Sequence, residues 1–166
     1  MDYDEYKNGL KKIRKELGEN IGIEWSTPLL QPVYDSTSKD RDLLGWKLTW
    51  AGPFEADEHY ICVREDWSGR PFEYHRRYFS YHYGPYHQLD KLESARWKAV
   101  VARIDDGNYE GRGCHIHDNS KDRRIHQDEL DHPSLWEFSI ETFIEAVIEL
   151  RKGRTVTQAF DLRFKK

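Results

Sequence analysis

The sequence predicts an α+β fold, a twisted antiparallel sheet of five to six strands with an N-terminal and a C-terminal helix packed on one face. Three observations predict it: a helical apolar stripe near each end of the chain, alternating apolar segments between them, and short turn-like connections. The 166 residues suit a single domain, 1–166. Within it, 1–60 holds the first helix with an irregular and strand extension, and 60–166 holds the sheet and the second helix.

The first helix is predicted over residues 2–17, because apolar side chains recur every three or four positions there. Gly18 is a typical C-terminal stop. The stripe consists of Tyr3, Tyr6, Leu10, Ile13 and Leu17.

Alternating residues predict the strands that follow. Trp46, Leu48 and Trp50 alternate with polar residues, which is typical of a half-buried strand. Residues 66–69 have the composition of a turn, and 119–132 that of a charged loop. The further strands are expected at 59–64, 72–83, 97–104, 113–118 and 156–164.

The second helix is predicted to begin at a capping box formed by Ser134 and Glu137 and to run to about Leu150. Gly153 ends it. Its apolar stripe consists of Trp136, Ile140, Phe143, Ile144, Val147 and Ile148.

Charge and composition favour a cytoplasmic protein without a cofactor. The first residues have no basic segment followed by an apolar one, and no stretch is long enough to span a bilayer. Net charge is −4, but residues 64–124 carry 12 Lys and Arg against 10 Asp and Glu, with five of the eight histidines. A locally basic face of this kind can bind a phosphate backbone. No phosphate-binding glycine loop, GxSxG or HExxH motif is present.

The sequence Cys114-His115-Ile116-His117-Asp118 is the most unusual feature. In a strand, His115 and His117 share one face, about 7 Å apart at ~3.3 Å per residue, and we expect that face to be accessible and the Cys114 and Ile116 face to be buried. Two imidazoles so placed suit a general base and a general acid for phosphodiester cleavage. They equally suit two metal ligands completed by Asp118 or another histidine, or simply a strand with outward histidines.

Two neighbouring segments carry groups that suit phosphate and RNA. By alternation, one face of strand 74–83 carries Tyr74, Arg76, Tyr78, Ser80 and His82. Arginine binds phosphate, tyrosine stacks on bases and histidine transfers protons. Arg103, at a strand end, suits stabilisation of a pentacovalent phosphate or an ion pair with Asp105. Arg124 belongs to a basic loop that suits RNA binding or simple solvation.

The order of these motifs over residues 72–150 resembles the TumE-like toxins of toxin–antitoxin systems. The match comprises the strand from Arg77 to Tyr83, the segment from Arg103 to Gly107, the HxH strand and the segment after Pro133 with its helix. The resemblance implies a RelE/barnase-like fold, ribonuclease activity and a cognate antitoxin as protein partner. The site that it implies consists of Tyr81, His82, Arg103, Asp105, His115 and His117.

Three functions follow as hypotheses. The first is a toxin-type endoribonuclease that cleaves RNA without a metal, with His115, His117, Arg103, His82 and Tyr81 as catalytic groups and Arg76, Tyr78, Asp105 and Arg124 as substrate-binding groups. The second is a binding module without catalysis. The third is a metal-dependent phosphodiesterase that uses the HxH strand.

Overall fold

The computed structural model describes residues 1–166 except 24–27, 86–101, 106–113, 119–120, 122 and 133–134. Of residues 17–21, 102, 103, 105, 132 and 136 it describes only the backbone. The regular elements, in chain order, are α1 (Tyr3–Ile21), β1 (Leu29–Tyr34), β2 (Leu43–Pro53), β3 (His59–Arg70), β4 (Glu73–Pro85), β5 (Ala102–Asp105), β6 (His115–Asp118), β7 (Arg123–His126), η3 (Gln127–Glu129), β8 (Leu130–His132), η4 (Leu135–Glu137), α3 (Ile140–Arg151), α4 (Val156–Ala159) and β9 (Arg163–Phe164).

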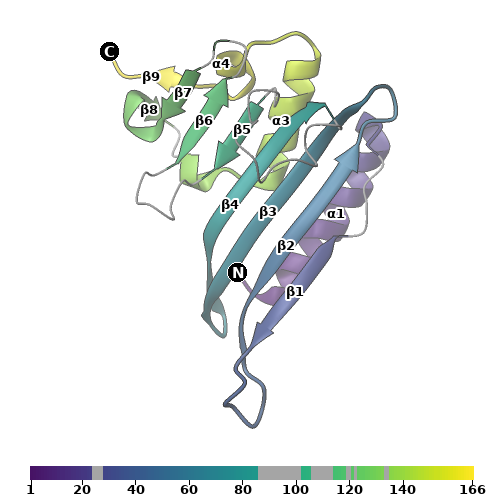
Figure 1. The fold of residues 1–166 in the computed structure, drawn as a ribbon, viewed down its shortest axis with the longest axis vertical. Helices are drawn as coiled ribbons and strands as arrows, with labels where there is room; N and C mark the ends of the chain where they lie inside the picture. The colour runs from purple at the N-terminus through teal and green to yellow at the C-terminus, as the bar shows by residue number, and fades with distance from the viewer. Residues whose placement is uncertain (24–27, 86–101, 106–113, 119–120, 122, 133–134) are drawn as a thin grey trace.

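The fold is α+β, and its strands β1 to β7 form one antiparallel sheet in chain order. The expected five to six strands were too few, because β1 and β7 were not expected as strands of the sheet: residues 29–34 pair with β2, and residues 123–126 of the predicted loop pair with β6. Figure 1 shows α1 and α3 behind the same face of this sheet, α1 behind β2 and α3 behind β4 and β5. None of the described helices is long and apolar enough to cross a bilayer.

Helix α1 forms where the apolar stripe predicted it. Asp2 caps its start and accepts hydrogen bonds from the backbone of Asp4 and Glu5. The helix continues past Gly18, the predicted stop, to Ile21, and Gly22 in the left-handed conformation caps its end. Tyr6, Leu10 and Ile13 are buried against the sheet. The ring of Tyr6 lies 5.3 Å from Trp46 and 5.4 Å from Trp67.

Helix α3 begins later than the capping box predicted. Residues 135–137 form a short 3₁₀ turn, and the α-helix starts at Ile140 with Ser139 as its cap, which accepts a hydrogen bond from the Thr142 backbone. Ser134 lies outside the described residues. Phe143 is fully buried, with its ring 5.5 Å from that of Tyr81 on β4.

Two other sequence predictions were wrong. Strand β3 does not end at Arg64 but continues through residues 66–69 to Arg70, because Trp67 stacks on Trp46 at 5.5 Å and keeps the ladder intact. The expected last strand 156–164 is the short helix α4, started by a Thr155 capping box, followed by β9 paired with β8. Of the expected strand 97–104, the described part begins at Ala102.

A β-bulge in β4 changes which residues share a face. Asp66 pairs with Tyr78 but Trp67 pairs with Arg76, so Arg77 is the additional residue. Tyr74 and Arg76 therefore lie on the helix side with Tyr81, whereas Tyr78, Ser80 and His82 lie on the other side. Strict alternation had placed all five of Tyr74, Arg76, Tyr78, Ser80 and His82 on one face.

Candidate functional site

The face of the sheet opposite α1 and α3 carries two rows of polar residues at its β4–β7 end. Directly paired backbone positions define the first, the His82 row: His82, Arg103, His117 and Arg124. The second, the Ser80 row, lies two positions away on each strand: Ser80, Asp105, His115 and His126. Side chains two positions apart in a strand share a face. The sheet therefore brings together on one face residues from a stretch of 47 positions, from Ser80 to His126.

The two histidines of the HxH strand contact each other directly. The Nε2 atoms of His115 and His117 are 2.9 Å apart, and their ring centroids are 4.7 Å apart at 63°. The rings are closer than the expected 7 Å because they lean together along the strand. At this distance one Nε2 donates a proton and the other accepts it, so both cannot be protonated at those atoms.

A second short contact links the two rows within β4. The hydroxyl oxygen of Ser80 lies 2.6 Å from Nε2 of His82. Ser80 is 1% exposed and His82 5%. The rows therefore contain two imidazole hydrogen bonds, each between side chains two positions apart on one strand.

The histidines are buried, which corrects the expected accessible face. His115 is 9% exposed and His117 3%, and Cys114 and Ile116, predicted to be buried, are buried as well. Arg124 and Tyr78 are more open, since Arg124 is exposed and Tyr78 intermediate. Burial of an imidazole strengthens its hydrogen bonds. It also leaves little of the ring surface open to a substrate.

The rows do not include every residue predicted for the site. Tyr81 neighbours His82 in sequence, so its side chain lies on the helix side, where it is fully buried. Arg76 lies on that side too, because of the bulge. Asp118 is 1% exposed and follows His117 directly, so the alternation separates it from the imidazole pair that it was expected to join.

The register places the backbones of Arg103 and Asp105 between the histidines of β4 and β6. Their side chains lie outside the described atoms. In the described part of the chain, no group of three His, Cys, Asp or Glu side chains has the arrangement of a metal site.

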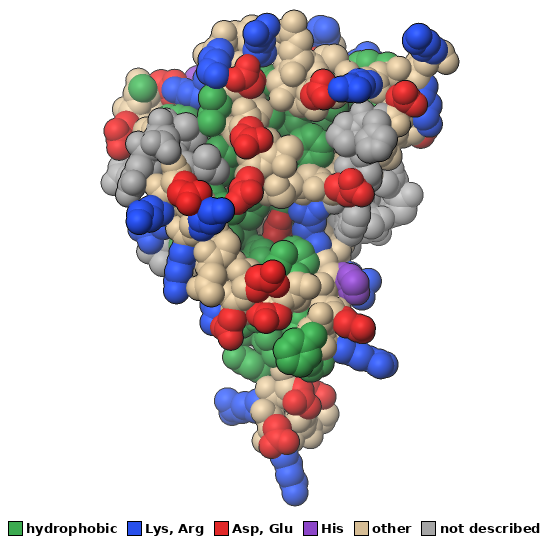
Figure 2. All heavy atoms as spheres, turned by 180° about the vertical axis from the view of Figure 1, so that it is seen from behind, with side chains coloured by type: hydrophobic (Ala, Val, Ile, Leu, Met, Phe, Trp, Pro, Cys, Tyr) green, Lys and Arg blue, Asp and Glu red, His purple; other side chains and the backbone are tan. Residues whose placement is uncertain are grey.

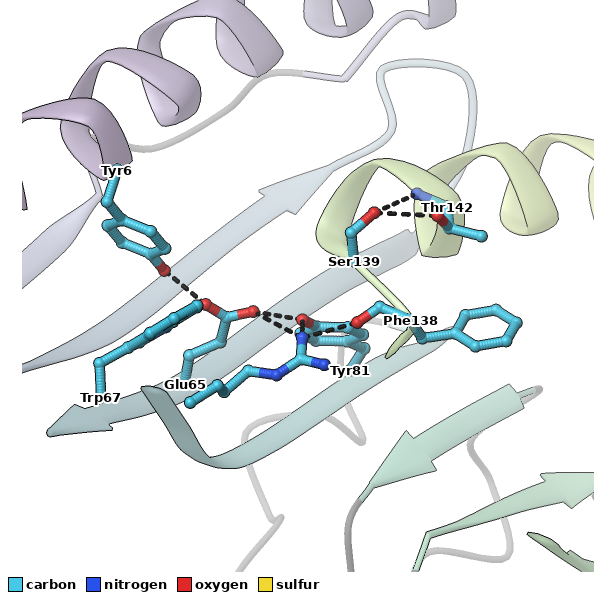
Figure 3. A network of polar contacts seen from close by, with 8 residues as sticks. Tyr6, Glu65, Trp67, Tyr81, Phe138, Ser139 and Thr142 are labelled. Carbon is cyan, nitrogen blue, oxygen red and sulfur yellow. Dashed lines mark hydrogen bonds and ion pairs between the residues drawn. The ribbon is translucent and has the colours of Figure 1, made fainter. Parts of the chain in front are cut away.

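On the helix side, a buried carboxylate organises a polar network that sequence reasoning missed. Glu65 is 2% exposed and accepts hydrogen bonds from Tyr6 at 2.6 Å, from the Trp67 indole at 2.7 Å, from Tyr81, and from Arg76 at 3.3 Å. Figure 3 shows these donors meeting from α1, β3 and β4. The signal was present in the sequence: if the strand is continued past Arg64, Glu65 falls on the same face as Ile61 and Val63, an inward position.

Arg76 connects this network to the start of α3. Its Nη1 atom donates to the Tyr81 hydroxyl and to the backbone oxygen of Phe138, each at 2.6 Å. Burial, and then the Glu65 charge, raise the pKa of Tyr6 and of Tyr81 above the ordinary tyrosine value. Both hydroxyls are therefore protonated donors to the Glu65 carboxylate.

A groove of about 880 Å³ opens above this network. It lies between α1 and the start of α3, and Tyr6, Leu10, Trp67, Phe138 and Arg76 line it. Figure 2 shows a hollow on this side of the molecule, with hydrophobic and charged side chains at its floor. The molecule thus has two candidate sites on opposite faces of one sheet, the histidine rows and this groove.

Comparison with protein-family models, with curated proteins and with solved structures gave no match. The resemblance to TumE-like toxins accordingly depends on the order of short motifs alone, and the two sites are interpreted from their own geometry.

Proposed function

We propose that the chain is an endoribonuclease of toxin type that cleaves RNA by general acid–base chemistry without a metal. The observation that supports it most is the His115–His117 contact of 2.9 Å within the two rows. Cleavage of a phosphodiester by this chemistry needs one group that accepts a proton and one that donates it, and the pair supplies two imidazole nitrogens side by side.

In this mechanism, one imidazole of the pair removes the proton of the ribose 2′-hydroxyl, and the 2′-oxygen then attacks the adjacent phosphorus. The other imidazole of the pair protonates the 5′-oxygen as it leaves, and the product is a 2′,3′-cyclic phosphate. The Arg103 guanidinium stabilises the negative charge of the phosphorane. His82, which is held by Ser80 at 2.6 Å, is the third imidazole available for proton transfer.

The substrate class follows from the surface beside the rows. Arg64 pairs with Ser80 across β3 and β4 and is exposed. Lys47, in the next row along the same face, is 61% exposed and lies 4.0 Å from the Asp66 carboxylate. Tyr78 lies between them and the histidines and supplies a ring for base stacking. Arg124 continues the cationic face on β7, and Asp105 lies within the Ser80 row. A RelE/barnase-like architecture and a cognate antitoxin are part of the same proposal.

The test is cleavage of a single-stranded RNA in EDTA. We expect fragments that end in a 2′,3′-cyclic phosphate, and no cleavage where a 2′-deoxynucleotide precedes the scissile bond. His117→Ala lowers the rate by roughly 10²–10⁴. The matched control is His59→Gln at the start of β3, outside both rows, which retains the rate; equal rates for His117→Ala and the wild type would remove the pair from the mechanism.

A non-catalytic binding module is the second candidate, and the burial of all three histidines favours it. It predicts that the wild-type protein cleaves no RNA at any concentration, with or without added divalent metal. Cleavage that appears only with added metal would instead support the metal-dependent phosphodiesterase.

A further inference from the structure

Gly9 is the starting point for an inference about the groove between α1 and α3. It lies in the interior of α1 and lines the groove. A Cβ atom built on it would meet nothing within 4 Å. Glycine in a helix interior is less stable than alanine, and no close contact in the described part of the chain requires it here. The missing side chain therefore serves to keep the groove open for an occupant.

The groove has an apolar interior, and its rim carries three exposed carboxylates together with the exposed His75 and Arg77. Tyr6, Leu10 and Ile13 form one wall, and Phe138 belongs to the other. Three further lining residues, Glu5, Glu137 and Glu141, are exposed carboxylates. This combination fits an aromatic side chain that is accompanied by a basic residue.

The β3–β4 hairpin of the same chain presents that combination. Phe72 at its tip is 82% exposed and has a φ angle of +68°, which is rare and strained for a non-glycine residue. Arg70, two residues before it, is exposed as well. Phe72 is thus a large apolar side chain held in solvent by a strained backbone conformation, and strain of this kind is enriched at ligand contacts and switch regions.

We propose that two copies of the chain form a dimer in which each inserts Phe72 into the groove of the other, with Arg70 against the carboxylates of Glu5, Glu137 and Glu141. Tyr74, which lines the groove, is only two residues from Phe72. The hairpin tip that inserts and the groove that receives it are therefore adjacent parts of one surface. Such a self-complementary surface closes by two-fold symmetry, because each contact is made twice.

The experiment is sedimentation velocity of the full chain from 1 to 200 µM. The wild type is expected to shift from monomer to dimer over this range, and Phe72→Ser to remain monomeric. Leu44→Ser, which removes another exposed apolar side chain, is the control and dimerises like the wild type.

Gly9 variants separate a filled groove from a damaged fold. Gly9→Ala and Gly9→Leu are both expected to raise the melting temperature, because both residues are better helix formers than glycine. Gly9→Ala still dimerises, whereas Gly9→Leu fills the groove and stays monomeric. An equimolar mixture of Phe72→Ser and Gly9→Leu can form one of the two contacts, so it is expected to associate more weakly than the wild type and more strongly than either variant alone.

A wild type that remains monomeric at 200 µM would overturn the proposal. So would dimers that persist in both Phe72→Ser and Gly9→Leu.

Discussion

At the scale of single residues, the helix side of the sheet is organised by Glu65, a buried carboxylate contacted by four donors. Its ion pair with Arg76 spans 3.3 Å, and the arginine is itself only 10% exposed. A buried pair of this kind contributes little net stability, but removal of one partner leaves an uncompensated charge.

Arg76→Met is therefore expected to lower the free energy of unfolding by about 3–5 kcal/mol. Urea titration followed by tryptophan fluorescence measures the change. Arg77→Met at the exposed bulge position is the matched control and should cost far less. A loss below about 1 kcal/mol, the typical value of an exposed pair, would show that Glu65 does not depend on Arg76.

The buried tyrosines of this network are expected to lower the stability of the fold at high pH. Burial and the Glu65 charge raise the pKa of Tyr6 and Tyr81, whereas in the unfolded chain a tyrosine loses its proton at about pH 10. The folded state thus binds more protons above pH 10, so this contribution is complete below pH 10 and is lost as the pH rises toward the folded pKa.

Urea midpoints at pH 8.5 and pH 11 test this dependence. We expect the wild type to lose more stability between the two pH values than Tyr81→Phe, which has one fewer titrating group. If the two proteins lose stability equally, Tyr81 ionises as readily in the fold as in the unfolded chain.

At the scale of elements, α3 holds the β4–β7 end of the sheet through Phe143, which is fully buried between Tyr81 and Phe160. Phe143→Ala is expected to destabilise the protein by about 3–5 kcal/mol through lost burial and the cavity it leaves. Glu145→Ala on the exposed side of the same helix is the control, with an effect within about 0.5 kcal/mol. Thermal unfolding of both variants provides the measurement, and similar melting temperatures would contradict this role of Phe143.

The elements also show what the sequence could and could not predict. The helical stripe of Tyr6, Leu10 and Ile13 and the alternation of Trp46, Leu48 and Trp50 were predicted correctly, since long periodic patterns report directly which side is buried. The β4 bulge was not, because one additional residue leaves the composition unchanged while it reverses the faces on which Arg76 and Tyr78 lie. Residues 66–69 resemble a turn in composition, but the contact of Trp67 with Trp46 outweighs that preference.

Of the candidate site, the sequence predicted the local spacing of the residues but not their burial or their alignment across strands. The pairing of His115 with His117 followed from their spacing, whereas their burial depends on what the rest of the chain places above them. Their alignment with His82 and Arg103 depends on sheet register, which short strands do not specify locally. The Glu65 network joins α1, β3 and β4, and no local pattern predicts such a long-range contact.

At the scale of the whole molecule, the sheet separates two surfaces: a groove beside the helices and, opposite it, a cationic face that leads to the histidine rows. Arg64→Gln on that face is expected to weaken binding of a 12-nucleotide single-stranded RNA to the His117→Ala protein. The plot of the logarithm of the association constant against the logarithm of the salt concentration should become less steep by about 0.7 for one lost phosphate contact. Fluorescence anisotropy measures both, and Lys12→Gln on the helix side is the control; equal slopes for the two variants would show that RNA does not cross this face.

The central claim is that one imidazole of the His115–His117 pair protonates the leaving 5′-oxygen. The most direct measurement is single-turnover cleavage of an RNA whose scissile 5′-oxygen is replaced by sulfur, a leaving group that needs no proton. We predict that His115→Ala and His117→Ala both cleave ordinary RNA slowly, and that sulfur restores the rate of the variant that lacks the acid but not that of the other. Slow cleavage of the sulfur substrate by both variants would contradict the claim.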